Sequence, residues 1–170
     1  MARLALGAWT SLYVAIGAII LGFTIGGTLG VIAGYFGGKV DTFLTGLFNI
    51  FLSIPGVVLA LALVAFLQGS AEQAQDAILS PELILIIAIG VVSIPLVGRI
   101  ARASALSWTQ REFVLAARSQ GAKHRRVIIK EVLPNVLPAI LSISLLGIAV
   151  AIVAEGTLAI LGVGIKPPTP

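Results

Sequence analysis

Long apolar runs are the feature that most restricts how this chain can fold. A helix needs about 20 mostly apolar residues to cross the hydrocarbon core of a bilayer. Four stretches of the 170-residue sequence reach about this length, namely 9–36, 40–67, 83–100 and 135–155. Charged residues make up only 11% of the chain, against about 25% in soluble domains. The sequence therefore predicts an all-α, polytopic transmembrane helix bundle in a lipid bilayer.

Glycines recur at every fourth position of the first stretch. The series consists of Gly22, Gly26, Gly30, Gly34 and Gly38. Residues four apart share one helix face, and small residues on that face let a second helix approach closely. We interpret the series as a helix-packing surface. The alternative is the general abundance of glycine in membrane helices.

Prolines interrupt the second and third stretches. Pro55 and Pro95 each remove one backbone hydrogen bond, so we expect a kink and a possible hinge at both positions. Asn49 and Ser53 precede Pro55 on neighbouring turns and share a face. Polar side chains at this depth usually face protein or water. Asn49 and Ser53 are therefore candidates for a translocation path. An interhelical hydrogen bond is an equally good interpretation of these two residues.

Glu155 lies near the end of the fourth stretch. A carboxylate in the middle of a bilayer costs about 2.5–3.5 kcal/mol on insertion scales, and less near the interface. Glu155 is therefore a candidate for the outer mouth of a pathway. An ordinary interfacial acid is the alternative.

The one long polar segment is REFVLAARSQGAKHRRVIIKEVLP, residues 111–134. Phe113, Ala117 and Gly121 share a helix face, and two of them are small, so another surface can come close. Gly121 predicts the end of a short helix before a second begins at Ala122, and Pro134 predicts the start of a new apolar helix. A basic loop that only fixes topology is one alternative. A DNA-binding helix–turn–helix is another, and it fits poorly because the segment is tethered between two membrane helices.

The basic residues are distributed unevenly. Residues 99–130 hold eight of the eleven Lys and Arg residues, and the acidic loop 68–82 holds none. The positive-inside rule therefore places 37–41 and 101–131 in the cytoplasm. Both termini of the chain and the acidic loop are then expected outside.

Several kinds of chemistry lack the residues they need. The chain has no cysteine and one histidine, His124, which is surrounded by Lys123, Arg125 and Arg126. A metal ion would compete poorly with that positive field. Gly38-Lys39 is followed by Val40, so no Walker A sequence for ATP is present. We expect a chain that is not an enzyme and that holds no cofactor or metal.

Several separated blocks resemble a known family. Ala116-Ala117, followed by Gly121 and then by Leu133-Pro134, resembles the EAA loop of inner-membrane permeases of ATP-binding-cassette (ABC) importers. The sequences AGYFGGKVD (33–41) and AILGVGIKPPTP (159–170) are similar to the dipeptide, oligopeptide and nickel type. Leu115 stands where the family often has Glu, and Gly46 and Asn49 stand where it commonly has Arg and Asp.

The resemblance implies a six-helix permease fold, with one further spanning helix before residue 9 and one after residue 170. It also implies a cytoplasmic coupling helix that docks in a groove of an ATPase subunit. The coupling residues would be Glu112, Ala116, Ala117, Arg118, Gly121, Leu133 and Pro134. The implied partners are a second, different permease subunit, two cytoplasmic ATPase subunits and an external solute-binding protein. The expected location is the cytoplasmic membrane of a bacterium or archaeon. No nucleic-acid partner is expected.

The resulting prediction is a permease subunit for peptides or similar small solutes. One alternative is a membrane scaffold or assembly protein without transport, and another is a self-sufficient channel. Co-purification with an ATPase separates the first interpretation from the other two.

Overall fold

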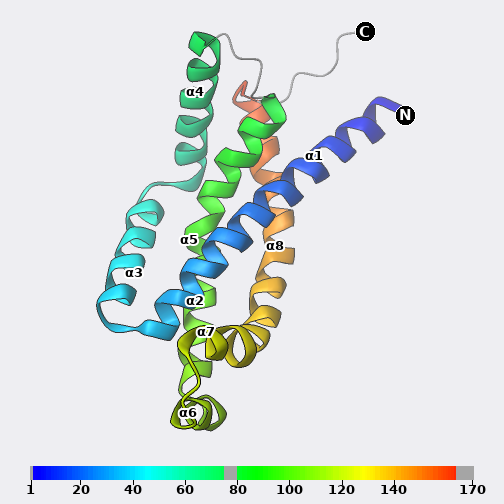
Figure 1. The fold of residues 1–170 in the computed structure, drawn as a ribbon. Coiled ribbons are helices and arrows are strands. Elements are labelled where there is room, and N and C mark those ends of the chain that lie inside the picture. The colour runs from blue at the N-terminus through cyan, green and yellow to red at the C-terminus, as the bar shows by residue number, and fades with distance from the viewer. Residues whose placement is uncertain (1, 75–79, 164–170) are drawn as a thin grey trace.

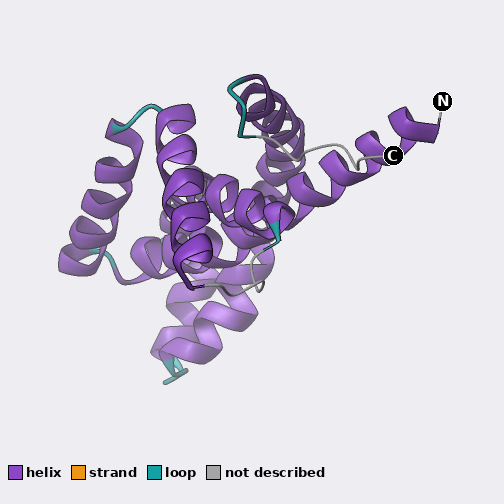
Figure 2. Cartoon of the chain, turned by 90° about the horizontal axis from the view of Figure 1, so that it is seen from above, coloured by secondary structure: helices purple, strands orange, loops and turns teal. Residues whose placement is uncertain are grey.

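The computed structural model describes residues 2–74 and 80–163, and the side chains of 7–70 and 80–163. Part of the acidic loop (75–79) and the proline-rich tail (164–170) lie outside the described residues. Every regular element in the described part is a helix (Figure 2). The elements are α1 (Ala2–Leu21), η1 (Gly22–Gly26), α2 (Gly27–Phe36), α3 (Gly38–Ser53), α4 (Gly56–Ala74), α5 (Pro81–Thr109), α6 (Glu112–Ser119), α7 (His124–Val127), η2 (Ile128–Val132) and α8 (Leu133–Ile160).

Three helices in the described part are long and apolar enough to cross a membrane. They cover Gly7–Phe36, Pro81–Thr109 and His124–Ile160, and the first and third each contain a π-helical turn, η1 or η2. The bent pair α3–α4 passes the same test when taken together, which gives up to four spans. The prediction of an all-α membrane bundle is confirmed. The last helix begins earlier than expected, because it runs without a break from His124 through Pro134.

The second predicted span is broken rather than kinked. α3 and α4 are inclined to one another by 88°. Ile54 at the break is extended, with φ −92° and ψ 130°, as is favoured for a residue that precedes proline. Pro55 lacks an N–H group, so the helical hydrogen bonding of α3 cannot continue through it. α5, in contrast, continues through Pro95, whose side chain is buried between neighbouring helices.

The glycine face of η1 and α2 lies directly against α5 (Figure 1). A Cβ atom on Gly30 would overlap the carbonyl oxygen of Gly98 and lie 2.7 Å from the Cβ of Ala101. A Cβ atom on Gly34 would lie 2.5 Å from the carbonyl oxygen of Arg102. Only glycine allows this backbone-to-backbone approach. The residues that face α5 in this way are Gly22, Gly26, Gly30 and Gly34.

Gly38, the fifth glycine of the series, has a different role. It is the first residue of α3, with φ +53° and open space where a Cβ atom would be. The packing face therefore ends at Gly34, and the chain reverses direction after Phe36.

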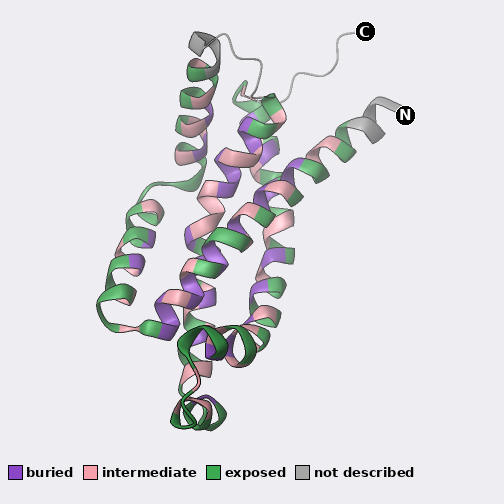
Figure 3. Ribbon diagram, in the orientation of Figure 1, coloured by how far each residue is buried: buried purple, intermediate pink, exposed green. Residues whose placement is uncertain are grey.

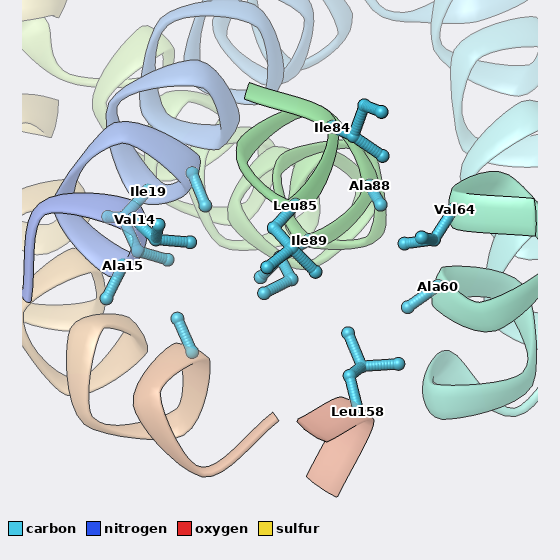
Figure 4. Close-up of a cluster of buried hydrophobic side chains, with 12 residues drawn as sticks. Val14, Ala15, Ile19, Ala60, Val64, Ile84, Leu85, Ala88, Ile89 and Leu158 are labelled. Carbon is cyan, nitrogen blue, oxygen red and sulfur yellow. The ribbon is translucent and has the colours of Figure 1, made fainter. Parts of the chain in front are cut away.

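Two buried clusters hold the helices together. The upper cluster joins α1, α4, α5 and α8, and its labelled side chains converge between these helices in Figure 4. The lower cluster joins α2, α5 and α8 to α6, α7 and η2. Its buried members are Val31, Tyr35, Val97, Ala101, Ala105, Val114, Val127, Val132, Val136 and Ile140. The outward faces of α3 and α8 carry mostly exposed residues (Figure 3).

The close approach of α2 to α5 gives the first testable prediction. Gly30→Ala should destabilise the complete protein by about 1–3 kcal/mol, because the added methyl group forces two backbones apart. Gly46→Ala is the matched control, since nothing lies within 4 Å of a Cβ atom at that position of α3. Thermal unfolding in detergent or nanodiscs measures both. Equal melting temperatures for Gly30→Ala and the unmodified protein would contradict the packing argument.

Candidate functional site

Helices α6, α7 and η2 form the basic segment, residues 111–132. This segment and the turn between α2 and α3 lie at the same end of the bundle (Figure 1). The Tyr35 hydroxyl, one residue before the end of α2, and Nδ1 of His124 in α7 are hydrogen-bonded at 2.9 Å. The Arg102 side chain near the end of α5 binds Asp41 in the first turn of α3. Residues that are far apart in the sequence therefore meet at this end of the bundle in two polar contacts.

α6 is a short helix with sharply defined ends. It follows an extended Arg111, with φ −75° and ψ 148°. Gly121 ends it in a left-handed conformation, with φ +80°. The Gly121 N–H donates to the Arg118 carbonyl at 2.9 Å, and the Ala122 N–H donates to the Ala117 carbonyl at 3.1 Å. This pair of bonds is a Schellman motif, and it confirms Gly121 as the residue that ends the helix.

The inner face of α6 is fixed to the bundle. Val114 is fully buried in the lower cluster, together with Val127 of α7 and Val132 of η2. Burying a valine side chain stabilises by roughly 1.5–3 kcal/mol relative to leaving it exposed. Ala117 and Ala122 pack against the same cluster. The segment is therefore a packed unit attached to the helices above it.

The outer face of α6 is free in the described structure. It carries Glu112, Leu115, Ala116 and Ser119, all exposed, and the side chain of Leu115 is 50% accessible. The two alanines of the pair therefore differ, because Ala117 is turned inward and half-buried while Ala116 is on the free face. The ring of Phe113 lies beside that of Trp108, with 6.2 Å between centroids. Ala116 therefore lies on the free face, while on the expected line Phe113 and Gly121 are exposed and Ala117 is half-buried.

Tyr35 connects α6 and α7 to α2, and we call this arrangement the Tyr35 clasp. Cζ of Arg118 lies 4.7 Å from the centroid of the Tyr35 ring, within the range of a cation–π interaction. The Tyr35 hydroxyl is hydrogen-bonded to His124, whose ring also lies 5.7 Å from that of Phe36. The Tyr35 side chain is 5% exposed. One buried aromatic residue therefore holds α6, through Arg118, and α7, through His124.

A bidentate ion pair connects α3 to α5. Nε and Nη2 of Arg102 both donate to the carboxylate of Asp41, and the Nη2–Oδ2 distance is 2.6 Å. The Thr45 hydroxyl donates to Oδ1 of Asp41 at 3.1 Å. Paired parallel bonds of this kind fix geometry as well as charge. Within residues 7–70 and 80–163 this is the one ion pair.

Leu133 and Pro134 lie away from the free face of α6. They are the first two residues of α8, and Leu133 packs against the lower cluster while Pro134 is exposed. They therefore belong to the helix that supports the basic segment.

The polar path candidates are placed on different helices. Asn49 and Ser53 are exposed on α3, and the Ser53 hydroxyl donates to the Ile50 carbonyl of its own helix at 2.7 Å. Glu155 is on α8, with an exposed fraction of 8%. Its Oε2 has no hydrogen-bond partner, and its neighbours on the same face, Ala151 and Leu158, belong to the upper cluster. Glu155 is therefore enclosed in the bundle, while Asn49 and Ser53 are accessible.

A family model for the binding-protein-dependent transport system inner membrane component matches residues 26–170. The chain belongs to this permease family. The match covers the α2–α5 contact, the Tyr35 clasp, the ion pair and α6.

Curated permeases are similar over the whole chain. The dipeptide transport system permease protein DppC of Alkalihalophilus pseudofirmus is 37% identical over 168 residues, which cover 99% of this chain and 52% of that protein. DppC of Haemophilus influenzae is 34% identical over 170 residues, or 100% and 54% of the two chains. The glutathione transport system permease protein GsiD of Pectobacterium atrosepticum is 29% identical over 168 residues, or 99% and 52%. The chain spans about half the length of these permeases.

A solved structure shares the fold of this permease-family chain. An inward-facing form of the MetNI methionine ABC transporter matches with a TM-score of 0.80 and 22% identity. The match covers 96% of this chain and 76% of the MetNI chain. Two independent comparisons, by sequence and by shape, therefore agree on a permease fold.

Sequence reasoning did not predict the contacts that Tyr35, Asp41 and Arg102 make. Tyr35 and Asp41 lie in the block AGYFGGKVD that carries part of the family resemblance. Arg102 follows the third predicted span, and in the sequence it indicates only where that span ends. Their roles depend on α2, α3 and α5 meeting at one end of the bundle. A chemical signal existed in Asp41, since an acid within a predicted membrane span usually pairs with another group.

The Tyr35 clasp gives the second testable prediction. Tyr35→Phe in the complete protein removes the bond to His124 and keeps the ring under Arg118. Losing one hydrogen bond of this kind costs about 0.5–1.5 kcal/mol. Amide hydrogen exchange over residues 111–127 should therefore become several-fold faster. Tyr13→Phe is the control, because Tyr13 is 59% exposed, and exchange rates in 111–127 that are the same in all three proteins would disprove the clasp.

Proposed function

We propose that this chain acts as a permease subunit of an ABC importer and forms the translocation path for peptides or similar small solutes. Family membership and the names of the dipeptide and glutathione permeases support this proposal. The chain has no Walker A sequence, so ATP hydrolysis is assigned to separate subunits.

The observation that carries the proposal is the two-sided character of α6. Its outer face is exposed and carries the small residue Ala116, while its inner face is buried through Val114. A helix that is free on one side and packed on the other can transmit the displacement of a docked protein to the bundle. We therefore assign the outer face of α6 as the docking surface for an ATPase subunit.

Two connections carry a displacement of α6 into the membrane helices. The Tyr35 clasp joins the basic segment to α2. α5, which leads into α6, is joined to α3 by the pair of Arg102 with Asp41. α3 would then move relative to α4 at the break before Pro55, and the exposed Asn49 and Ser53 on α3 would line the path whose width changes. Pro95, buried inside α5, is a second proposed flex point.

The energy requirement is compatible with a docked ATPase. Shifting a two-state equilibrium from 1:99 to 99:1 takes about 5.5 kcal/mol of differential binding. ATP-dependent binding of two ATPase subunits to the docking surfaces of two permease subunits supplies this bias, since each docked helix is attached to its bundle through buried contacts.

The proposal includes partners and an orientation. The partners are a second, different permease subunit, two ATPase subunits and an external solute-binding protein. The membrane is the cytoplasmic membrane of a bacterium or archaeon, with residues 101–131 in the cytoplasm and the acidic loop and the termini of the chain outside. The uneven distribution of Lys and Arg supports this orientation.

The docking surface gives the third testable prediction. Ala116→Trp in the complete permease should abolish assembly with the ATPase subunits and reduce solute uptake at least tenfold, because the indole group fills the space needed for close contact. Ala116→Ser is the matched control and should behave as the unmodified protein. Co-purification and uptake into proteoliposomes measure both steps. Since Ala116 is exposed, the melting temperature of the isolated permease should not change.

Normal assembly and uptake in the Ala116→Trp protein would disprove the docking surface. Failure of the unmodified permease to bind any ATPase would favour the scaffold or channel alternatives.

A further inference from the structure

An apolar groove runs along the bundle next to the basic segment, and we call it the α2–α8 groove. It has a volume of about 590 Å³. One wall is formed by Thr24, Thr28 and Ile32, which share a face of η1 and α2, and the other by side chains of η2 and α8. The two walls meet at Gly27, where a Cβ atom would lie 3.6 Å from Ile140. The absence of a side chain on Gly27 therefore deepens the groove.

The groove is apolar even where its wall contains threonines. The Thr24 hydroxyl donates to the Ile20 carbonyl at 2.8 Å, and the Thr28 hydroxyl donates to the Thr24 carbonyl at 2.5 Å. Both hydroxyl groups are thus satisfied within their own helix. The occupant meets methyl groups and aliphatic chains, which suit hydrocarbon rather than a polar solute.

One end of the groove is strongly basic. His124 and Arg125 line this end, and an adjoining pocket of about 270 Å³ is lined by Lys123, Arg125, Arg126, Ile129 and Lys130. All four cationic side chains are exposed. None of them forms an ion pair with a carboxylate in the described part of the chain. The four cations are therefore available to an anionic group from outside the chain.

We propose that the α2–α8 groove binds an anionic phospholipid of the inner leaflet. An acyl chain lies between the two walls, and the phosphate group binds Arg125, Arg126 and their basic neighbours. Basic pockets between membrane helices on the cytoplasmic side suit anionic head groups. Charge complementarity favours a lipid over an apolar protein helix, because a phospholipid supplies both a hydrocarbon chain for the groove and an anionic group for the adjoining cations. The inner-leaflet assignment rests on the proposed orientation of the permease.

The site also suggests a functional consequence. A phosphate group on Arg125 and Arg126 would lie one residue away from His124, which the Tyr35 clasp holds. Bound lipid would therefore restrain the basic segment beside α6 and stabilise the arrangement in which α6 docks.

The experiment uses the complete permease with its partner subunits in nanodiscs. Binding of fluorescent phosphatidylglycerol is compared with binding of phosphatidylcholine carrying the same acyl chains. The double variant R125Q/R126Q should weaken phosphatidylglycerol binding roughly 10- to 30-fold. Thr28→Phe should weaken binding of both lipids by blocking the groove. Lys39→Gln is the charge control, because Lys39 is exposed at the same end of the bundle but does not line the groove.

A photo-crosslinking residue at Thr28 identifies the occupant directly, and crosslinks to lipid are expected. Crosslinks to another polypeptide would overturn the proposal, as would equal affinity for the two lipids or an equal loss of affinity in Lys39→Gln. Melting curves show whether each variant is folded. Lipid binding is measured without ATP or solute, so a failure here is distinguishable from a failure of the proposed transport function.

Discussion

The contact between the glycine face of α2 and the backbone of α5 is the constraint on which the rest of the structure depends. Gly30 faces the backbone of Gly98, and Gly34 faces that of Arg102. A step of four residues along α2 therefore matches a step of four residues along α5. Because van der Waals contact and not the hydrophobic effect holds helices together in lipid, such close approach is a main source of attraction there. It also places the end of α2 beside the end of α5.

That placement creates the polar site. Tyr35 at the end of α2 can reach Arg118 and His124, and Arg102 near the end of α5 can reach Asp41. These residues form two connections, one from the basic segment to α2 and one from α5 to α3. Under the proposed function, these contacts would pass a displacement of α6 to α2, α3 and α5. Rigid contacts are needed for this, since a flexible loop would absorb the displacement instead of transmitting it.

The break between α3 and α4 complements these rigid contacts. α2, α5 and α8 are continuous helices packed by the two buried clusters, whereas the α3–α4 pair changes direction by 88° at Ile54 and Pro55. α3 is held at its beginning by the Asp41–Arg102 pair, and its other end joins α4 through the break. One end of α3 is thus tied to α5, and the other lies at the break in the α3–α4 pair.

The sequence by itself determined the membrane class, the helical content and the position of the polar segment, because apolar run length and charge are local properties of the chain. It also located the end of α6 at Gly121 and the glycine series, since helix ends and i, i+4 spacing are local as well. The permease resemblance followed from short blocks in the same way.

Only the tertiary structure decided that Ala117 faces inward while Ala116 is free, because the inward side of an amphipathic helix depends on what it packs against. Likewise, it alone decided that the helix breaks at the exposed Pro55 and continues through the buried Pro95, because packing around a proline depends on neighbouring helices. The pairing of Arg102 with Asp41 and of Tyr35 with His124 joins residues separated by 61 and 89 positions, and only the folded bundle brings such residues together.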